Sequence, residues 1–283
     1  MNKYIGPLSL LTIGILFGLS GVIAKYLSSW LNPYQVIALR FAGAFIMAYS
    51  VVLFTGQKIK FKKLNKQTLL LFAVSFPISV IFFTLSVFYT KVSLAVFSFY
   101  IANLVSSFIC GSVFFKETIE RKKQITLLCI MAALICFTNP FQGFTLNIGF
   151  IFGLISGVLQ TIASIFQKIL GESTDRLGLV MIQTLAGCVM AVIVLIFTHT
   201  LTIPWMPLTA WGVIALFGAM FLAISYLFLI GFQKTNLNVG SILVSSELLF
   251  GPLFALLLLN EMPSGLELLG GIFTIVAVVI ANI

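Results

Sequence analysis

The sequence predicts an all-α polytopic membrane protein with ten transmembrane helices, arranged as two inverted-topology repeats of five helices. Three observations lead to this prediction: the composition, the long apolar segments and an internal repeat. Of the 283 residues, 60% are hydrophobic and 8% are charged, whereas soluble domains carry about 25% charged residues. A membrane β-barrel would show segments of about ten residues with alternating polarity, and the unbroken apolar segments of this chain do not alternate.

Ten apolar segments are suited to crossing a bilayer, because about 20 residues at 1.5 Å each span a ~30 Å hydrocarbon core. The run from Leu69 to Phe115 is too long for one crossing, so a turn at 90–92 is expected to divide it into a helical hairpin. Most prolines fall near segment ends, where a missing backbone donor costs little. Pro77 lies inside the third segment and predicts a kink. The expected spans are 5–26, 33–55, 67–89, 93–115, 123–139, 147–169, 177–199, 209–232, 236–259 and 264–282.

Positive charge gathers in a few connectors and predicts the orientation. Thirteen of the sixteen Lys and Arg residues lie in the N-terminal segment and in every second connector, and such an excess marks the cytoplasmic side. The first apolar segment is expected to be retained as a span, because no cleavage site stands out. We therefore expect a multi-pass protein of the cell (inner) membrane with cytoplasmic N- and C-termini. The thirteen residues are Lys3, Lys58, Lys60, Lys62, Lys63, Lys66, Lys116, Arg121, Lys122, Lys123, Lys168, Arg176 and Lys234.

Two pairs of landmarks indicate that the chain repeats itself. Gly14 precedes Lys25 by the same interval that separates Gly157 from Lys168, an offset of 143 residues. The segment 114–117 resembles 258–261 at an offset of 144, and this register places Asn103 opposite Glu247. Five spans per half would invert the second copy in the membrane. The expected domains are 1–140 and 146–283; the alternative is chance similarity between Leu- and Phe-rich segments.

The ninth span, within Asn236–Glu261, carries a carboxylate near its middle. Glu247 is followed by Gly251 and Pro252, and an ionised group at that depth costs at least ~2.5–3.5 kcal/mol on insertion scales. Such a residue is kept where it faces a wet cavity or a partner inside the protein. Glu247 is therefore a candidate proton or cation site, or an anchor for a substrate amine. A structural ion pair and a carboxyl group buried in its protonated form are equally open.

Arg40 is the second candidate, because it lies about seven residues into the second span, roughly 10 Å deep. Its guanidinium could pair with Glu247 or bind a substrate carboxylate. It could equally extend to the outer lipid headgroups, as long basic side chains do. Lys25 is expected to extend in that way. Lys168, Glu117 and Glu261 lie at span ends, where helix-end charges and connector contacts are the expected roles.

Polar side chains on two further spans indicate a shared cavity. Tyr100, Asn103 and Ser107 share one face of the fourth span, and Gln160, Ser164 and Gln167 share one face of the sixth. Such stripes can also be interhelical hydrogen bonds worth ~0.6 kcal/mol each. The further cavity residues that we expect are Phe17, Ser20, Phe83, Tyr89, Tyr226 and Ser245.

In combination, several of these features resemble the EamA domains of the drug/metabolite transporter superfamily. They are Phe17-Gly18 and Lys25, Pro33 with Arg40-Phe41, Ser246-Glu247 at the start of the second half of span nine, and the two span endings at Glu117 and Glu261. The family usually has Pro directly after the ninth-span Glu, whereas here Leu248 follows and Pro252 comes later, which displaces any kink. The resemblance implies a ten-helix secondary transporter with inverted halves, often an exporter of amino acids or other metabolites. It also implies a cavity lined by spans one, three, four, six, eight and nine, with five and ten peripheral.

Other classes of function lack the residues that they would need. No catalytic constellation, phosphate loop or metal-ligand cluster is present in the sequence, so neither an enzyme, a cofactor nor a metal is expected. The four cysteines lie inside apolar segments without metal-ligand spacing. The net charge of +9 comes from short connectors, which argues against nucleic-acid binding.

The sequence therefore favours a non-ATP transporter of small metabolites, with amino acids the best single guess and alternating access as the mechanism. A broad-specificity drug or cation exporter is the alternative, and a membrane enzyme or a non-transporting scaffold fits less well. The expected partners are a small-molecule substrate, a coupled proton and the lipid bilayer. A homodimer stays open.

Overall fold

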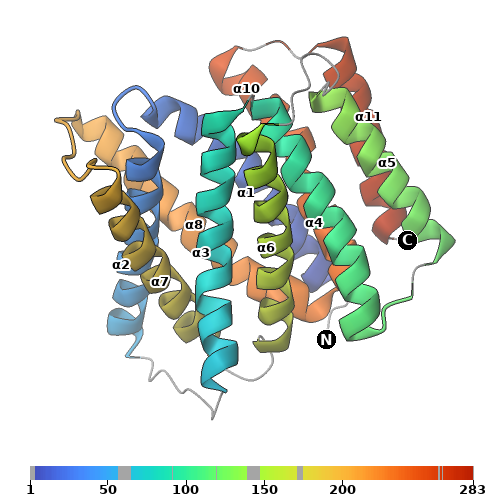
Figure 1. Ribbon diagram of the computed structural model, residues 1–283, viewed down its shortest axis with the longest axis horizontal. Coiled ribbons are helices and arrows are strands. Elements are labelled where there is room, and N and C mark those ends of the chain that lie inside the picture. Colours follow the sequence, from blue (N-terminus) through green and yellow to red (C-terminus); the bar gives the residue numbers. More distant parts are fainter. Residues whose placement is uncertain are drawn as a thin grey trace.

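The computed structural model describes residues 4–56, 65–90, 92–118, 120–138, 147–170, 175–260, 262 and 264–282. Every regular element in these ranges is a helix, which confirms the predicted all-α class (Figure 1). The helix bounds differ from the expected spans by at most two residues, except that the ninth span is divided. The helices are α1 (Ile5–Leu27), α2 (Pro33–Thr55), α3 (Lys66–Tyr89), α4 (Val92–Phe115), α5 (Arg121–Thr138), α6 (Ile148–Leu170), α7 (Arg176–Phe197), α8 (Leu208–Lys234), α9 (Leu237–Val244), α10 (Glu247–Leu259) and α11 (Gly265–Asn282).

Eight segments of the described chain are long and apolar enough to cross a membrane, and the pair α9–α10 supplies one of them. The helices α5 and α11 are shorter, with 18 residues each, and are not among the eight. The structure therefore supports a multi-pass membrane protein without settling the count of ten. The predicted hairpin is present as α3 and α4, and α3 continues unbroken through Pro77.

The ninth span corrects the expected position of its kink, which Pro252 was predicted to displace. The helical hydrogen bonds tighten at Ser245–Ser246, where Ser246 N donates to Leu243 O and Leu248 N donates to Ser245 O, each three residues back. The Ser245 hydroxyl also donates to Ile242 O at 2.6 Å, and such local bonds compete with a regular helix. The break thus falls at the serine pair, and Pro252 lies inside α10. Glu247 becomes the first residue of the second half-helix.

The helix contacts are preserved when the two halves of the chain are exchanged. Helix α1 packs on α8 and on α9–α10, and α6 packs on α3 and α4; α2 contacts α7, and α5 lies beside α11 (Figure 1). The match extends to single residues. A Cβ atom on Gly14 would lie 3.1 Å from Glu247 N, and one on Gly157 would lie 2.8 Å from Asn103 N. These equivalent contacts support a two-repeat architecture in the register that the sequence predicts.

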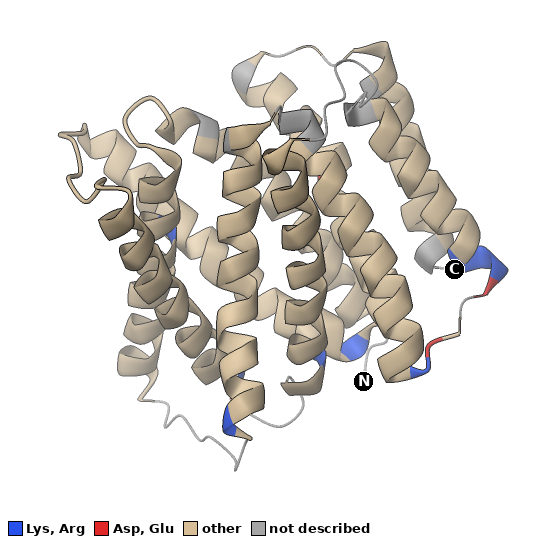
Figure 2. Ribbon diagram, in the orientation of Figure 1, with Lys and Arg blue, Asp and Glu red and all other residues tan. Residues whose placement is uncertain are grey.

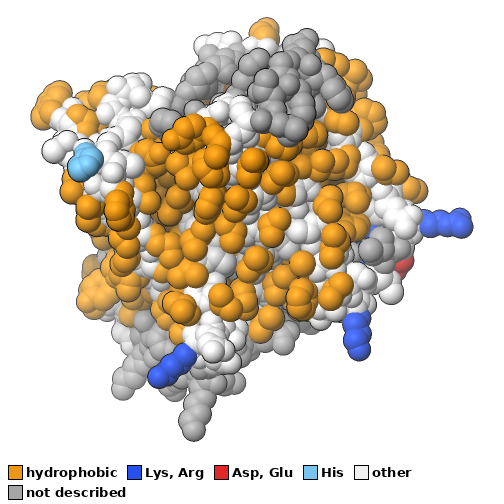
Figure 3. Space-filling view, in the orientation of Figure 1, with side chains coloured by type: hydrophobic (Ala, Val, Ile, Leu, Met, Phe, Trp, Pro, Cys, Tyr) orange, Lys and Arg blue, Asp and Glu red, His pale blue; other side chains and the backbone are white. Residues whose placement is uncertain are grey.

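The surface separates apolar sides from charged ends. Hydrophobic side chains cover most of the face shown in Figure 3, and Lys and Arg gather along the lower edge of Figure 2. Apolar sides of this kind match a lipid environment. We call the charged edge the lysine-rich end. Its basic residues among those described include Lys66, Lys116, Arg121, Lys168, Arg176 and Lys234.

The opposite end carries the α1–α2 and α7–α8 connectors. The side chain of Asn32 accepts from Gln35 N and the side chain of Gln35 accepts from Asn32 N, forming a capping box at the start of α2. The Gln35 amide also donates to the carbonyl oxygens of Thr200 and Thr202, at 3.1 and 2.8 Å. This one side chain therefore ties the two halves of the protein together at that end.

Candidate functional site

A cavity of about 330 Å³ lies between the two halves, at the lower end of the range of about 300–1,000 Å³ for small-molecule sites. Residues of α1, α2, α3, α4, α6, α8, α9 and α10 line it, and no described residue of α5, α7 or α11 is among them. The resemblance had implied the same helices apart from α2, which adds Arg40. The lining reaches Ser28, Leu31 and Pro33, so the cavity extends toward the end opposite the lysines.

Glu247 enters the cavity from the first turn of α10. A helix N-terminus carries partial positive charge, which favours a carboxylate there. The hydroxyl of Tyr100, from α4, donates a hydrogen bond to Glu247 Oε2. Glu247 is the one acidic residue among the described lining residues, and its other oxygen has no hydrogen-bond partner among them. The carboxyl group can thus receive a proton or a cationic ligand while Tyr100 holds it in place.

Arg40 faces the cavity from the second turn of α2. Its guanidinium carbon lies 4.8 Å from the ring centroid of Phe221, 5.4 Å from that of Phe217 and 5.8 Å from that of Phe41, within the range of cation–π contacts. Its Nε is buried without a hydrogen-bond partner among the described residues. Arg40 is thus held by aromatic rings inside the protein, an environment that differs from lipid headgroups.

A polar cluster borders the cavity where α4, α6 and α9 meet. Asn103 Nδ2 donates to Thr161 Oγ1 at 3.2 Å, and the hydroxyls of Ser106 and Ser107 lie 2.7 and 3.1 Å from the same oxygen. The hydroxyl of Ser241 donates to Ser107 Oγ at 2.7 Å. These polar groups satisfy one another's hydrogen bonds, and the cluster joins the two halves of the protein. Asn103 also lies at the edge of the cavity.

The structure brings most of the predicted site residues together. Those that line the cavity are Glu247, Arg40, Tyr100, Asn103, Gln160, Phe17, Ser20 and Phe83.

Six predicted cavity residues lie outside the cavity lining: Ser107, Ser164, Gln167, Tyr89, Tyr226 and Ser245. The buried hydroxyls of Ser164 and Ser245 donate to backbone carbonyls of their own helical segments, those of Gln160 and Ile242. Tyr89 is 56% exposed and Tyr226 is 37% exposed. Their helices therefore turn these side chains toward neighbouring helices or toward the surface.

Sequence reasoning missed much of the aromatic wall. Phe76, Phe217, Phe221 and Phe228 all line the cavity. Among 29 Phe residues no single one stands out. A signal was nevertheless available in α8, where the three Phe residues follow a helical spacing of i, i+4 and i+11 and so share one face.

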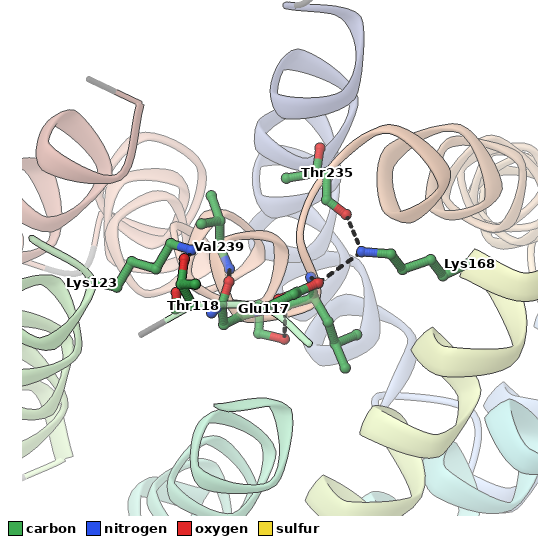
Figure 4. A network of polar contacts seen from close by, with 9 residues as sticks. Glu117, Thr118, Lys123, Lys168, Thr235 and Val239 are labelled. Carbon is green, nitrogen blue, oxygen red and sulfur yellow. Dashed lines mark hydrogen bonds and ion pairs between the residues drawn. The ribbon is translucent and has the colours of Figure 1, made fainter. Parts of the chain in front are cut away.

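A second polar site, the Glu117 network, lies at the lysine-rich end and is shown in Figure 4. Glu117 Oε1 accepts hydrogen bonds from Lys168 Nζ at 2.8 Å and from Leu237 N at 2.7 Å, and Oε2 accepts from Asn238 N at 3.3 Å. Lys168 also donates to Thr235 O at 3.1 Å. The network joins the ends of α4 and α6 to the start of α9. Glu117 and Lys168 therefore connect distant segments, in addition to the local helix-end roles expected of them. Glu261 lies outside the described residues.

Comparison with known proteins gives a family and a fold. The family model described as the EamA-like transporter family matches residues 4–139 and 147–283. A solved structure described only as "Crystal structure of protein" superimposes with a TM-score of 0.83 at 13% sequence identity, covering 100% of this chain and 97% of that one. This likeness concerns the fold alone. No curated protein matches the sequence.

Proposed function

The chain belongs to the EamA-like transporter family, and on this premise we propose that it is a secondary transporter that exports amino acids or related small metabolites by alternating access. The observation that carries the proposal is the cavity between the two halves, which holds Glu247 and Arg40 within segments apolar enough to span a membrane. Transporters with inverted repeats bind their substrates at such a place. Ten spans, in repeats over 1–140 and 146–283 with both termini cytoplasmic, belong to the same proposal.

The packing between the cavity and the lysine-rich end fits one state of an alternating-access cycle. Between the cavity and the lysine-rich end lies a core that includes Leu10, Ile13, Phe232, Leu237 and Leu243, each at most 1% exposed. The cavity itself extends the other way, toward the α1–α2 connector. A transporter needs a second packing in which this core opens and the opposite end closes.

The first test measures transport by purified protein in proteoliposomes, with radiolabelled L-amino acids supplied one at a time. For a transported compound, Glu247→Gln and Arg40→Ala are each expected to lower the rate by about tenfold or more, because a hydrogen bond to a charged group contributes about 1.5–3 kcal/mol. Glu120→Gln and Arg121→Ala are the matched controls, since these exposed residues lie at the lysine-rich end. Wild-type rates in both cavity variants would remove the two residues from the mechanism.

A broad-specificity cation exporter is the second candidate function. The aromatic walls and the carboxyl group of Glu247 would suit an apolar cation. Arg40 argues against it, because a fixed positive charge in the same cavity repels such a substrate. Transport of a lipophilic cation at rates above those of every amino acid would favour this candidate.

A further inference from the structure

Arg40 is a cation beside the cavity, and the described residues offer it no counterion. Its side chain forms no hydrogen bond or ion pair with the described residues. Its guanidinium instead contacts the aromatic rings of Phe41, Phe217 and Phe221. Cation–π contacts compensate only part of the cost of removing a guanidinium from water. Some further group is therefore needed to balance this charge.

The acid in the same cavity does not fill that role. Glu247 takes its hydrogen bond from Tyr100, on α4, and forms no ion pair with Arg40. The cavity thus displays one positive and one negative group separately, each with hydrogen-bonding capacity to spare. A direct ion pair between Arg40 and Glu247 would instead neutralise both charges.

We propose that Arg40 is the subsite for a carboxylate of the transported molecule, and that Glu247 receives its ammonium group. This inference rests on the proposed transport function and names its substrate class: zwitterions with an apolar body. The planar guanidinium can bind a carboxylate through two parallel hydrogen bonds. No other Lys or Arg is found among the described lining residues, so a doubly charged phosphate would keep one charge unbalanced.

The aromatic walls of the cavity favour an apolar side chain on the transported molecule. Phe17, Phe76, Phe83 and Phe228 line the cavity beyond the two charged groups, and their rings offer apolar surface to a side chain. Polar groups of the substrate other than its two charges would find few partners there.

The test compares binding of matched compounds to purified protein by calorimetry. The probes are L-leucine and L-phenylalanine, their primary amides, which lack the carboxylate, and the corresponding deaminated acids, which lack the ammonium group. Wild-type protein is expected to bind an amino acid about tenfold to a hundredfold more tightly than its amide. Arg40→Ala should bind the amino acid and its amide equally, and Glu247→Gln should instead lose the preference over the deaminated acid.

Arg40→Lys guards against a variant that fails to fold, because it keeps the charge and the stem but loses the two-pronged geometry. It should recover part of the preference for the carboxylate, whereas Arg121→Ala should behave as wild type. Equal binding of amino acid and amide by the wild-type protein would overturn the proposal, as would an undiminished preference in Arg40→Ala. In either case, transport of any solute in proteoliposomes would leave the transport function standing.

Discussion

Replacing Gly157 by valine is expected to destabilise the protein by about 3 kcal/mol or more, at the upper end of what overpacking of a core costs. Gly157 lies where α6 crosses α4, and a Cβ atom there would lie 2.8 Å from both Ala102 Cβ and Asn103 N. Because the obstacle includes the backbone of α4, no rotation of a side chain can relieve the clash. The helices must separate, and the polar cluster around Asn103 and Thr161 would separate with them.

Gly212→Val provides the matched control. Gly212 is a glycine of another membrane-spanning helix, α8, but nothing lies within 4 Å of a Cβ atom built there. Unfolding of both variants in the same detergent, followed by circular dichroism, measures the difference. Equal stability of the two variants would show that α4 and α6 do not pack as closely as described.

Helix positions were predictable from the sequence because lipid imposes a simple length requirement. An apolar segment must be long enough to cross the hydrocarbon core, and charged or proline-containing connectors must lie outside it. The ends of the third and fourth spans were placed well for this reason, although only Lys91 interrupts the apolar run between them. Glu247 was predictable as a cavity residue on the same principle, because a carboxylate in a lipid-facing position is too costly.

The position of Pro252 did not predict the break in the ninth span, because the break depends on local hydrogen bonding. Proline is the residue that most often interrupts a helix, and Pro252 drew attention for that reason. In the structure the interruption lies at Ser245–Ser246, where serine side chains and carbonyls replace regular helical bonds. The family resemblance placed the start of the second half at Ser246-Glu247, whereas the position of Pro252 alone predicted a later kink.

Side-chain direction set the other limit, since these helices are apolar on nearly every face. In α6, Gln160 and Ser164 belong to one predicted stripe, yet of these two residues only Gln160 lines the cavity. The difference is one helical turn along the axis, which periodicity does not resolve. For the same reason, the sequence does not show which Phe residues form the walls of the cavity.

The Glu117 network was beyond sequence reasoning because its members are distant in the chain. Lys168 lies 51 residues after Glu117, and the amide of Leu237 lies 120 residues after it. Helix-end charges on a connector are usually solvated and contribute little. Here the side chain of Glu117 is 5% exposed and that of Lys168 is 18% exposed, so the pair lies in the interior rather than on a wet surface.

Glu117→Ala is therefore expected to destabilise the folded protein by about 3–5 kcal/mol, the cost of removing one partner from a buried ion pair. Among the described residues, the variant leaves the ammonium group of Lys168 with only Thr235 O and Phe115 as partners. It also leaves the first amides of α9, at Leu237 and Asn238, without their acceptor. Chemical unfolding of the purified protein measures the effect, and Glu120→Ala removes an exposed carboxylate nearby as the control.

The same substitution should also loosen the lysine-rich end, because the Glu117 network ties the start of α9 to α4 and α6. Ser241 reports on this opening, since it is 2% exposed and lies between the network and the cavity. A cysteine placed there, in a protein whose four native cysteines are replaced by alanine, should react faster with a water-soluble maleimide when Glu117→Ala is added. The variant Lys168→Met removes the other partner of the ion pair. If both substitutions act through this ion pair, the double variant Glu117→Ala/Lys168→Met should lose less stability than the sum of the two single variants. Strict additivity, with unchanged labelling at position 241, would mean that Glu117 and Lys168 stabilise this end independently of each other.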